Sequence, residues 1–349
     1  MNENENGSNI NQVADRDKPV TLSPDKLITV SASPHIKSGE TTATIMTSVI
    51  FALMPAFAWG LYIFGFRVLT LTLISVISCV LFEFLFQKIM KKPVTVSDLS
   101  AVVTGILITF NMPVNTPLWA PVVGAAFAII IVKQLFGGIG KNIVNPALAA
   151  RVFLFLSFNF MAAFQDITAE KLSPFKINVD VTAGATPLVS LKHGMSPDIE
   201  MFSMFLGEKG GCIGEISVLC LLAGAVYLIW RKVITWHTPV SFIGVVAAVT
   251  FFLPHGTVDG LNFALGQILS GGLCLGAIYM ATDYATSPIT KSGKLIFGAG
   301  CGLITVFIRY FGAYPEGVSF AILIMNLFVW YIDKFTKPVK FGGVSNAGK

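Results

Sequence analysis

The stretch VLTLTLISVISCVLFEFLF at residues 68–86 decides the fold class. It carries a single charged residue, Glu83, and a run of about 20 mostly apolar residues is long enough to cross a membrane as a helix. The whole chain has this character: of its 349 residues 54% are hydrophobic and 12% are charged, against about 25% charged residues in soluble domains. The sequence therefore predicts an all-α integral membrane protein. It excludes a disordered chain, disfavours a soluble fold, and makes the net charge of +5 no sign of nucleic-acid binding.

Ten such segments follow one another along the chain, and two of them are interrupted. The third ends in FNMPVNTP at residues 110–117, and the eighth contains Gly271 and Gly272. The expected spans are residues 44–64, 68–86, 97–111, 118–135, 143–164, 213–230, 238–253, 261–281, 295–311 and 317–332.

Basic residues predict the orientation of these spans, because cytoplasmic connections are enriched in Lys and Arg. Both termini and every even-numbered connection are basic, whereas the third and seventh connections have no Lys or Arg and the first has only Arg67. Both termini are therefore expected in the cytoplasm of a multi-pass protein of the cell membrane. The basic residues are Arg16, Lys18, Lys26, Lys37, Lys88, Lys91, Lys92, Lys133, Lys141, Arg231, Lys232, Lys291, Lys294, Lys334, Lys337 and Lys340.

One long connection divides the chain into two halves of five spans. We expect a cytoplasmic segment at 1–40, a first half at 41–164, an extracytoplasmic loop at 165–212, a second half at 213–335 and a cytoplasmic tail at 336–349. Halves with five spans each have opposite topology, which an inverted repeat requires. The segments FNMPVNTP (110–117) and MATDYATSP (280–288) match in position, although helix ends in general collect Asn, Asp, Thr and Pro.

Charged residues inside apolar spans are costly unless they are paired or hydrated, so function is the default hypothesis for each. The main cases are Glu83, Arg151, Glu215, Asp283 and Arg309. For Glu83 we favour structural pairing between helices.

A glycine-rich turn, GGIGKNIVNP at residues 137–146, precedes the fifth span. It lacks the spacing of a phosphate-binding P-loop. Asn142 and Asn145 place amide groups at membrane depth next to a helix N-terminus, which suits a polar heterocycle or a phosphate. A tight turn between packed helices explains the pattern equally well.

The cysteines and histidines predict no metal centre, and no residue pattern predicts a catalytic side chain. None of the five cysteines forms a CxxC pair, and the four histidines lie in loops or near span ends. We interpret the cysteines as small buried side chains; a thiolate ligand shared with a partner chain stays open.

The long connection contains DVTAGATPL at residues 180–188. Gly184 and Ala185 leave the hydroxyl of Thr186 accessible. By chemistry alone this is an ordinary turn of small residues.

Seven ordered segments, the GATPL motif among them, resemble one family of integral-membrane flavoproteins, the NqrB/RnfD family. Its members are membrane subunits of the Rnf complex and of the sodium-pumping NADH:quinone reductase, and the short N-terminus resembles the Rnf branch. The segments are SPHI (33–36), TGILITFNMP (104–113), FGGIGKNIVNPA (136–147), GGCIGEIS (210–217), MATDYATSPIT (280–290) and YPEGVSFAILIMN (314–326), and the seventh is the GATPL motif (184–188) with Asp180 upstream.

The resemblance implies that FMN is joined through its phosphate to Thr186, within a motif that includes Asp180, Gly184 and Ala185. A separate flavin transferase makes this bond outside the cytoplasm, on the side where the basic residues place Thr186. The chain departs from the family in one position: Ala183 stands where the motif commonly has Ser or Thr.

By the same resemblance, a second and non-covalent flavin, riboflavin, is implied at Asn142, Asn145 and Asp283. The family's Rnf complexes pass electrons between ferredoxin and NAD⁺ and couple this to Na⁺ or H⁺ movement. The chain is therefore expected to be a redox subunit with other complex subunits and lipid as partners. The alternative is a flavin-free solute transporter or channel of inverted-repeat architecture.

Overall fold

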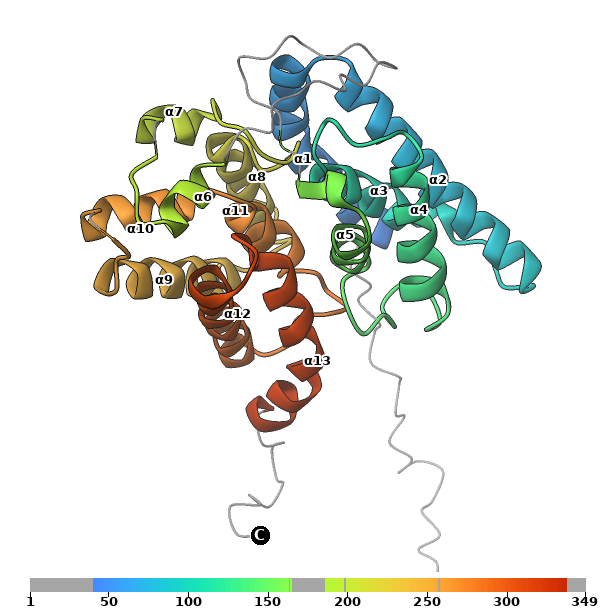
Figure 1. The fold of residues 1–349 in the computed structure, drawn as a ribbon. Helices are drawn as coiled ribbons and strands as arrows, with labels where there is room; N and C mark the ends of the chain where they lie inside the picture. The colour runs from blue at the N-terminus through green and yellow to red at the C-terminus, as the bar shows by residue number, and fades with distance from the viewer. Residues whose placement is uncertain (1–39, 163, 165–185, 198, 257, 338–349) are drawn as a thin grey trace, which may run out of the picture. The chain divides into compact units, whose positions relative to one another are not determined.

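The computed structural model describes residues 40–162, 164, 186–197, 199–256 and 258–337. This part of the chain is helical and contains no strand (Figure 1), as the composition predicts. The elements before residue 165 are α1 (Thr42–Phe64), α2 (Arg67–Ile89), η2 (Val96–Asp98), α3 (Ser100–Phe110), α4 (Ala120–Ala126), η3 (Phe127–Gln134), α5 (Pro146–Ser157) and η4 (Asn159–Ala162).

The later elements begin with two short helices that precede the second set of apolar segments. They are α6 (Pro187–Lys192), α7 (Met201–Leu206), α8 (Val218–Trp230), α9 (His237–Phe252), α10 (Gly260–Leu269), α11 (Leu273–Leu275), η5 (Gly276–Met280), α12 (Lys291–Phe311) and α13 (Val318–Thr336).

Each of the ten expected spans contains a helix, but the helices differ in length from the prediction. Four of those described, α1, α2, α12 and α13, are long and apolar enough to cross a membrane, and the bent pair Gly260–Leu269 with Leu273–Met280 makes up to five. The other five segments form shorter apolar helices. Local capping explains this: α5 starts only where the Asn145 side chain accepts from Ala147 N, and α8 only at the Ser217 cap.

The distribution of side chains is that of a membrane protein. Large apolar side chains such as Phe51, Ile77 and Phe307 are more than 60% exposed. Small polar ones lie inside: Ser75 is fully buried and its hydroxyl donates to Gly105 O at 2.8 Å. Lipid tails solvate the apolar surface, so hydrogen bonds and close backbone packing hold the helices together.

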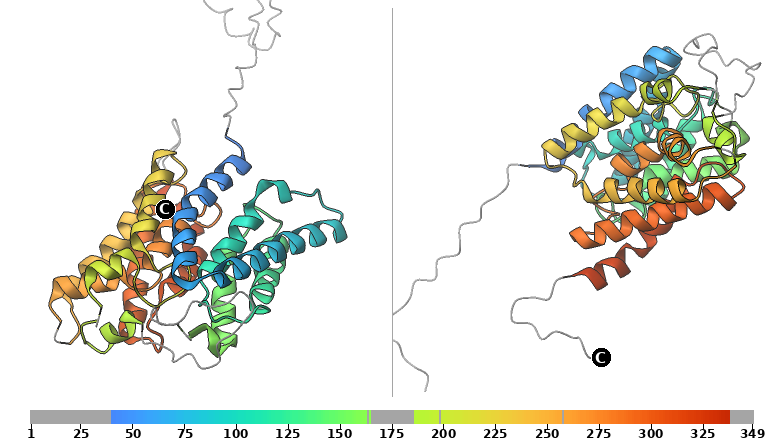
Figure 2. Two further views of the ribbon diagram at one scale, coloured as in Figure 1. Left: turned by 90° about the horizontal axis from the view of Figure 1, so that it is seen from above. Right: turned by 90° about the vertical axis from the view of Figure 1, so that its left-hand side faces the viewer.

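Equivalently placed helices of the two halves pack against each other. The first helices, α1 and α8, lie side by side (Figure 2), and so do the last ones, α5 and α13. Within the halves, α2 packs on α4 and α9 packs on α12 (Figure 1). The α9–α12 contact is close because α12 presents Gly298 and Gly302, where an added Cβ would lie within 2.9 Å of α9 carbonyl oxygens.

Candidate functional site

Thr186 is the residue on which the sequence analysis concentrates, and it is the N-cap of α6 with extended backbone angles. Its carbonyl accepts from Val189 N at 2.8 Å, and its side chain makes no capping hydrogen bond. The motif residues Asp180, Gly184 and Ala185 lie outside the described residues.

A cavity of about 260 Å³ lies beside Thr186, and we call it the first cavity. Its walls are mainly apolar, and the rings of Phe155 and Tyr314 meet edge to face with centroids 4.8 Å apart. Its polar end is formed by charged side chains from distant parts of the chain. These are Arg151, Lys209, Glu215 and Glu316.

Arg151 is the central side chain of this polar end. It projects from α5 and is 9% exposed. Its Nη1 donates to Asn111 Oδ1 at 2.7 Å, and its Nη2 donates to Glu316 Oε2 at 2.7 Å. The guanidinium therefore connects the end of α3 with the segment that precedes α13, which belongs to the second half of the chain.

Glu316 links Arg151 to the break in the eighth segment. Its Oε1 accepts from Gly272 N at 2.7 Å, between α10 and α11. The preceding residue, Gly271, has φ +66°, a conformation that glycine adopts without strain. Burial acts to raise the pKa of Glu316, but the positive charges of Arg151 and Arg309 outweigh it and hold the pKa below its usual value.

The same break collects further charges. Lys209, in the loop before α8, is 1% exposed and donates to Leu269 O, and burial lowers its pKa to about 8. Arg309 donates through Nη1 to Gln267 O at 2.6 Å. Glu215 accepts from Cys212 N at 2.9 Å through Oε1, whereas its Oε2 is buried without a partner among the described residues. Three cationic side chains and two carboxyl groups thus surround the break.

A second cavity of about 380 Å³ brings together Asn142, Asn145 and Asp283. The two asparagines precede α5, whereas Asp283 follows η5 in the second half of the chain. Asn145 donates to Met280 O at 3.3 Å, which ties the two segments together. Both π-helical segments contribute lining residues as well, such as Lys133 of η3 and Tyr279 of η5. Such segments often mark functional sites.

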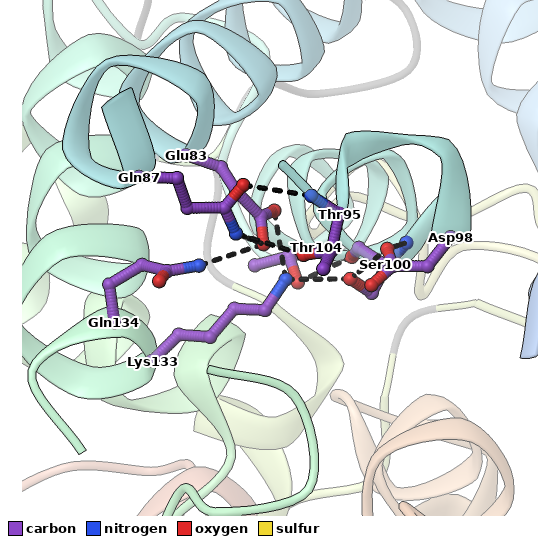
Figure 3. Close-up of polar contacts among 8 residues, drawn as sticks. All are labelled: Glu83, Gln87, Thr95, Asp98, Ser100, Thr104, Lys133 and Gln134. Carbon is purple, nitrogen blue, oxygen red and sulfur yellow. Dashed lines mark hydrogen bonds and ion pairs between the residues drawn. The ribbon is translucent and has the colours of Figure 1, made fainter. Parts of the chain in front are cut away.

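One wall of the second cavity is a buried polar network around Glu83 (Figure 3). Lys133 Nζ donates to Glu83 Oε2 at 2.9 Å and to Ser100 Oγ at 2.6 Å, and Gln134 Nε2 donates to Glu83 Oε1 at 2.8 Å. The structural pairing expected of Glu83 is therefore confirmed. Lys133 differs from the prediction: it is 3% exposed and belongs to this network, so Lys141 is the basic residue of that connection.

The remaining predicted residues divide between these two places. Arg151 and Glu215 line the first cavity with Thr186, Asp283 lines the second, and Arg309 lies behind the first. Sequence reasoning missed Glu316 and Lys209 as site residues. The available signal was a single charge directly beside an apolar segment, in YPEGV and in GEKGG.

Comparison with known proteins settles the family. The model described as the NQR2, RnfD, RnfE family matches residues 29–342, nearly the whole chain. The chain belongs to this family. Its described residues place the family segments GGIGKNIVNP and MATDYATSP at one cavity, and YPEGV with GGCIGEIS at the other.

Curated relatives of this family member extend over most of both chains, and all three named here are the same subunit of their respective complexes. The relative from the Na⁺-translocating ferredoxin:NAD⁺ oxidoreductase complex of Acetobacterium woodii is 46% identical over 90% of this chain and 95% of its own. The one from the proton-translocating complex of Clostridium ljungdahlii is 40% identical over 90% and 96%. The one from the ion-translocating oxidoreductase complex of Escherichia coli O1:K1 is 35% identical over 90% and 98%.

Proposed function

We propose that this chain is a membrane flavoprotein subunit of an ion-translocating ferredoxin:NAD⁺ oxidoreductase complex. The support is the likeness to the equivalent subunits of such complexes over 90% of the chain. Its partners are then the other subunits of the complex and the surrounding lipid. The relatives are named for Na⁺ in one organism and for protons in another, so the coupling ion of this chain is for measurement to decide.

The proposed cofactor of the first cavity is FMN, bound through its phosphate to Thr186 by a flavin transferase. The residues present fit this group, because Thr186 lines a cavity whose wall is apolar and aromatic and whose polar end holds Arg151 and Lys209. Isoalloxazine has the same division into an apolar benzenoid end and a polar pyrimidine end. When bound, FMN supplies the ability to accept and release electrons singly or in pairs.

Riboflavin is the proposed ligand of the second cavity. Asn142, Asn145 and Asp283 offer amide donors and acceptors and a carboxylate to a polar heterocycle, and Lys133 adds a positive charge to the same cavity. Two flavins at separate cavities would let electrons pass through this subunit.

We further propose a topology of ten membrane-crossing segments, including short and broken ones, arranged as two inverted repeats of five. The packing of α1 on α8 and of α5 on α13 supports this arrangement. Both termini are then cytoplasmic, Thr186 is extracytoplasmic, and the second cavity is near the cytoplasmic side. Labelling of single cysteines introduced at Ser38 and Ser190 with an impermeant reagent tests this: only the second is expected to react from outside.

The deciding experiment measures flavin on the denatured subunit. After expression with its native transferase, the wild-type band is expected to fluoresce yellow-green in a denaturing gel, Thr186→Ala to be dark, and the neighbouring-hydroxyl control Thr182→Ala to fluoresce like wild type. A dark wild-type band would favour the flavin-free transporter. Full electron transfer by the Thr186→Ala complex would favour a purely structural subunit.

A further inference from the structure

The polar end of the first cavity shows a division of labour among its charged side chains. Lys209 and Arg309 are directed at backbone carbonyls of the helix break, at Leu269 and Gln267. Arg151 instead lines the cavity and contacts side chains only.

The guanidinium of Arg151 retains donors for a ligand. A guanidinium has five N–H donors. The described residues offer Arg151 three acceptors: Asn111 Oδ1, Glu316 Oε2, and Cys212 Sγ at 3.9 Å. Asn111 and Glu316 also hold the group in one orientation, and Arg151 is nine-tenths buried, so its charge is weakly screened.

Thr186 and Arg151 line the same cavity, with apolar side chains such as Val152, Phe155 and Leu188 between the two kinds of wall. A planar ring tethered at Thr186 would bury its apolar end against these side chains. Its oxygen-bearing edge then has Arg151 as a fixed cationic donor, with Glu316 next to it as the opposing charge.

On the basis of the proposed FMN attachment, we propose that Arg151 is the positioning residue that sets the midpoint potential of the flavin on Thr186, and that Glu316 opposes it. Reduction adds negative charge to the ring system. A fixed positive charge favours the reduced flavin and a fixed negative charge disfavours it. The two members of one ion pair thus shift the same potential in opposite directions.

The test is a redox titration of the Thr186 flavin in the purified complex, followed by flavin absorbance. Arg151→Gln is expected to lower the midpoint potential, so that the equilibrium constant for reduction falls about tenfold or more. Glu316→Gln is expected to raise the potential, and Arg151→Lys, which keeps the charge, to stay near wild type. Iodide quenching of flavin fluorescence should be weak in wild type and stronger in Arg151→Gln.

Controls separate this proposal from the function on which it rests. Arg231→Gln changes an exposed charge after α8 and should leave the potential unchanged. Because Arg151→Gln leaves the Glu316 carboxylate without its partner, the double variant Arg151→Gln/Glu316→Gln serves if the single one does not accumulate, with a potential between those of the two singles. A flavin that remains on Thr186 while Arg151→Gln and Glu316→Gln leave the potential unchanged or shift it the same way overturns the role of Arg151 and leaves the proposed function standing. A wild-type chain without flavin overturns both.

Discussion

Arg151 Nη2 lies 2.7 Å from Glu316 Oε2, although the two residues are 165 positions apart. This ion pair joins α5 of the first half to the segment before α13 of the second, and Glu316 passes the connection on to the backbone of Gly272. A charge change in the first cavity therefore acts directly on the hydrogen bond that holds the break between α10 and α11.

Gly272 is expected to tolerate no side chain. An added Cβ would lie 2.7 Å from Glu215 Oε2 and 2.8 Å from Glu316 Oε1. Gly272→Ala should therefore destabilise the protein by about 1–3 kcal/mol, measured by thermal unfolding in detergent. Gly244→Ala is the matched control, because an added Cβ there meets no atom within 4 Å. Equal unfolding temperatures for the two variants would contradict the packing around the break.

The Glu83–Lys133 pair is expected to be needed as a pair. Both side chains are nearly inaccessible, so Glu83→Gln leaves the buried ammonium of Lys133 without its counter-charge. We expect a loss of about 3–5 kcal/mol in the free energy of unfolding. Glu83→Leu/Lys133→Met, which removes both charges, should recover most of it in equilibrium unfolding in mixed micelles. A double variant as unstable as the single one would show that the charges themselves are not the cause.

Lys209 is expected to make stability depend on pH in the alkaline range. Because burial lowers its pKa to about 8, the folded protein releases this proton at a lower pH than the unfolded chain does. Between about pH 8 and pH 10.5 the unfolded chain binds more protons, so the free energy of unfolding should rise with pH, by at most about 1.4 kcal/mol per pH unit. Unfolding curves at several pH values check this, and Lys209→Met should remove the rise. The same slope in both proteins would assign the effect to other groups.

The second cavity is expected to lose its flavin without affecting the first. Asn142→Leu removes an amide from the cavity wall and should lower the riboflavin released by acid extraction at least severalfold, while the fluorescence of the Thr186 band persists. Asn262→Leu, on the exposed face of α10, is the control. Unchanged riboflavin in Asn142→Leu would remove this residue from the binding site.

Local features of the chain were predictable to different extents. The number and order of apolar helical segments followed from hydropathy, and the interruptions at residues 110–117 and Gly271 followed from Pro and Gly. Helix lengths did not, because α5 and α8 begin at the caps Asn145 and Ser217, inside an apolar stretch that composition alone would make fully helical. Lys133 was assigned to a basic loop because only the packing of η3 on α2 brings it to Glu83.

The sequence by itself determined the membrane class, the candidate orientation and the residues that carry the family motifs, including Thr186, Asn142, Asn145 and Asp283. Hydropathy and motifs are local properties, so a short window is enough to detect them. Only the tertiary structure decided that Asn145 and Asp283 line one cavity and that Thr186 lines another with Arg151 and Glu316. Asn145 and Asp283, like Arg151 and Glu316, lie more than a hundred residues apart, and the packing of helices, which no local pattern encodes, sets the distance between them.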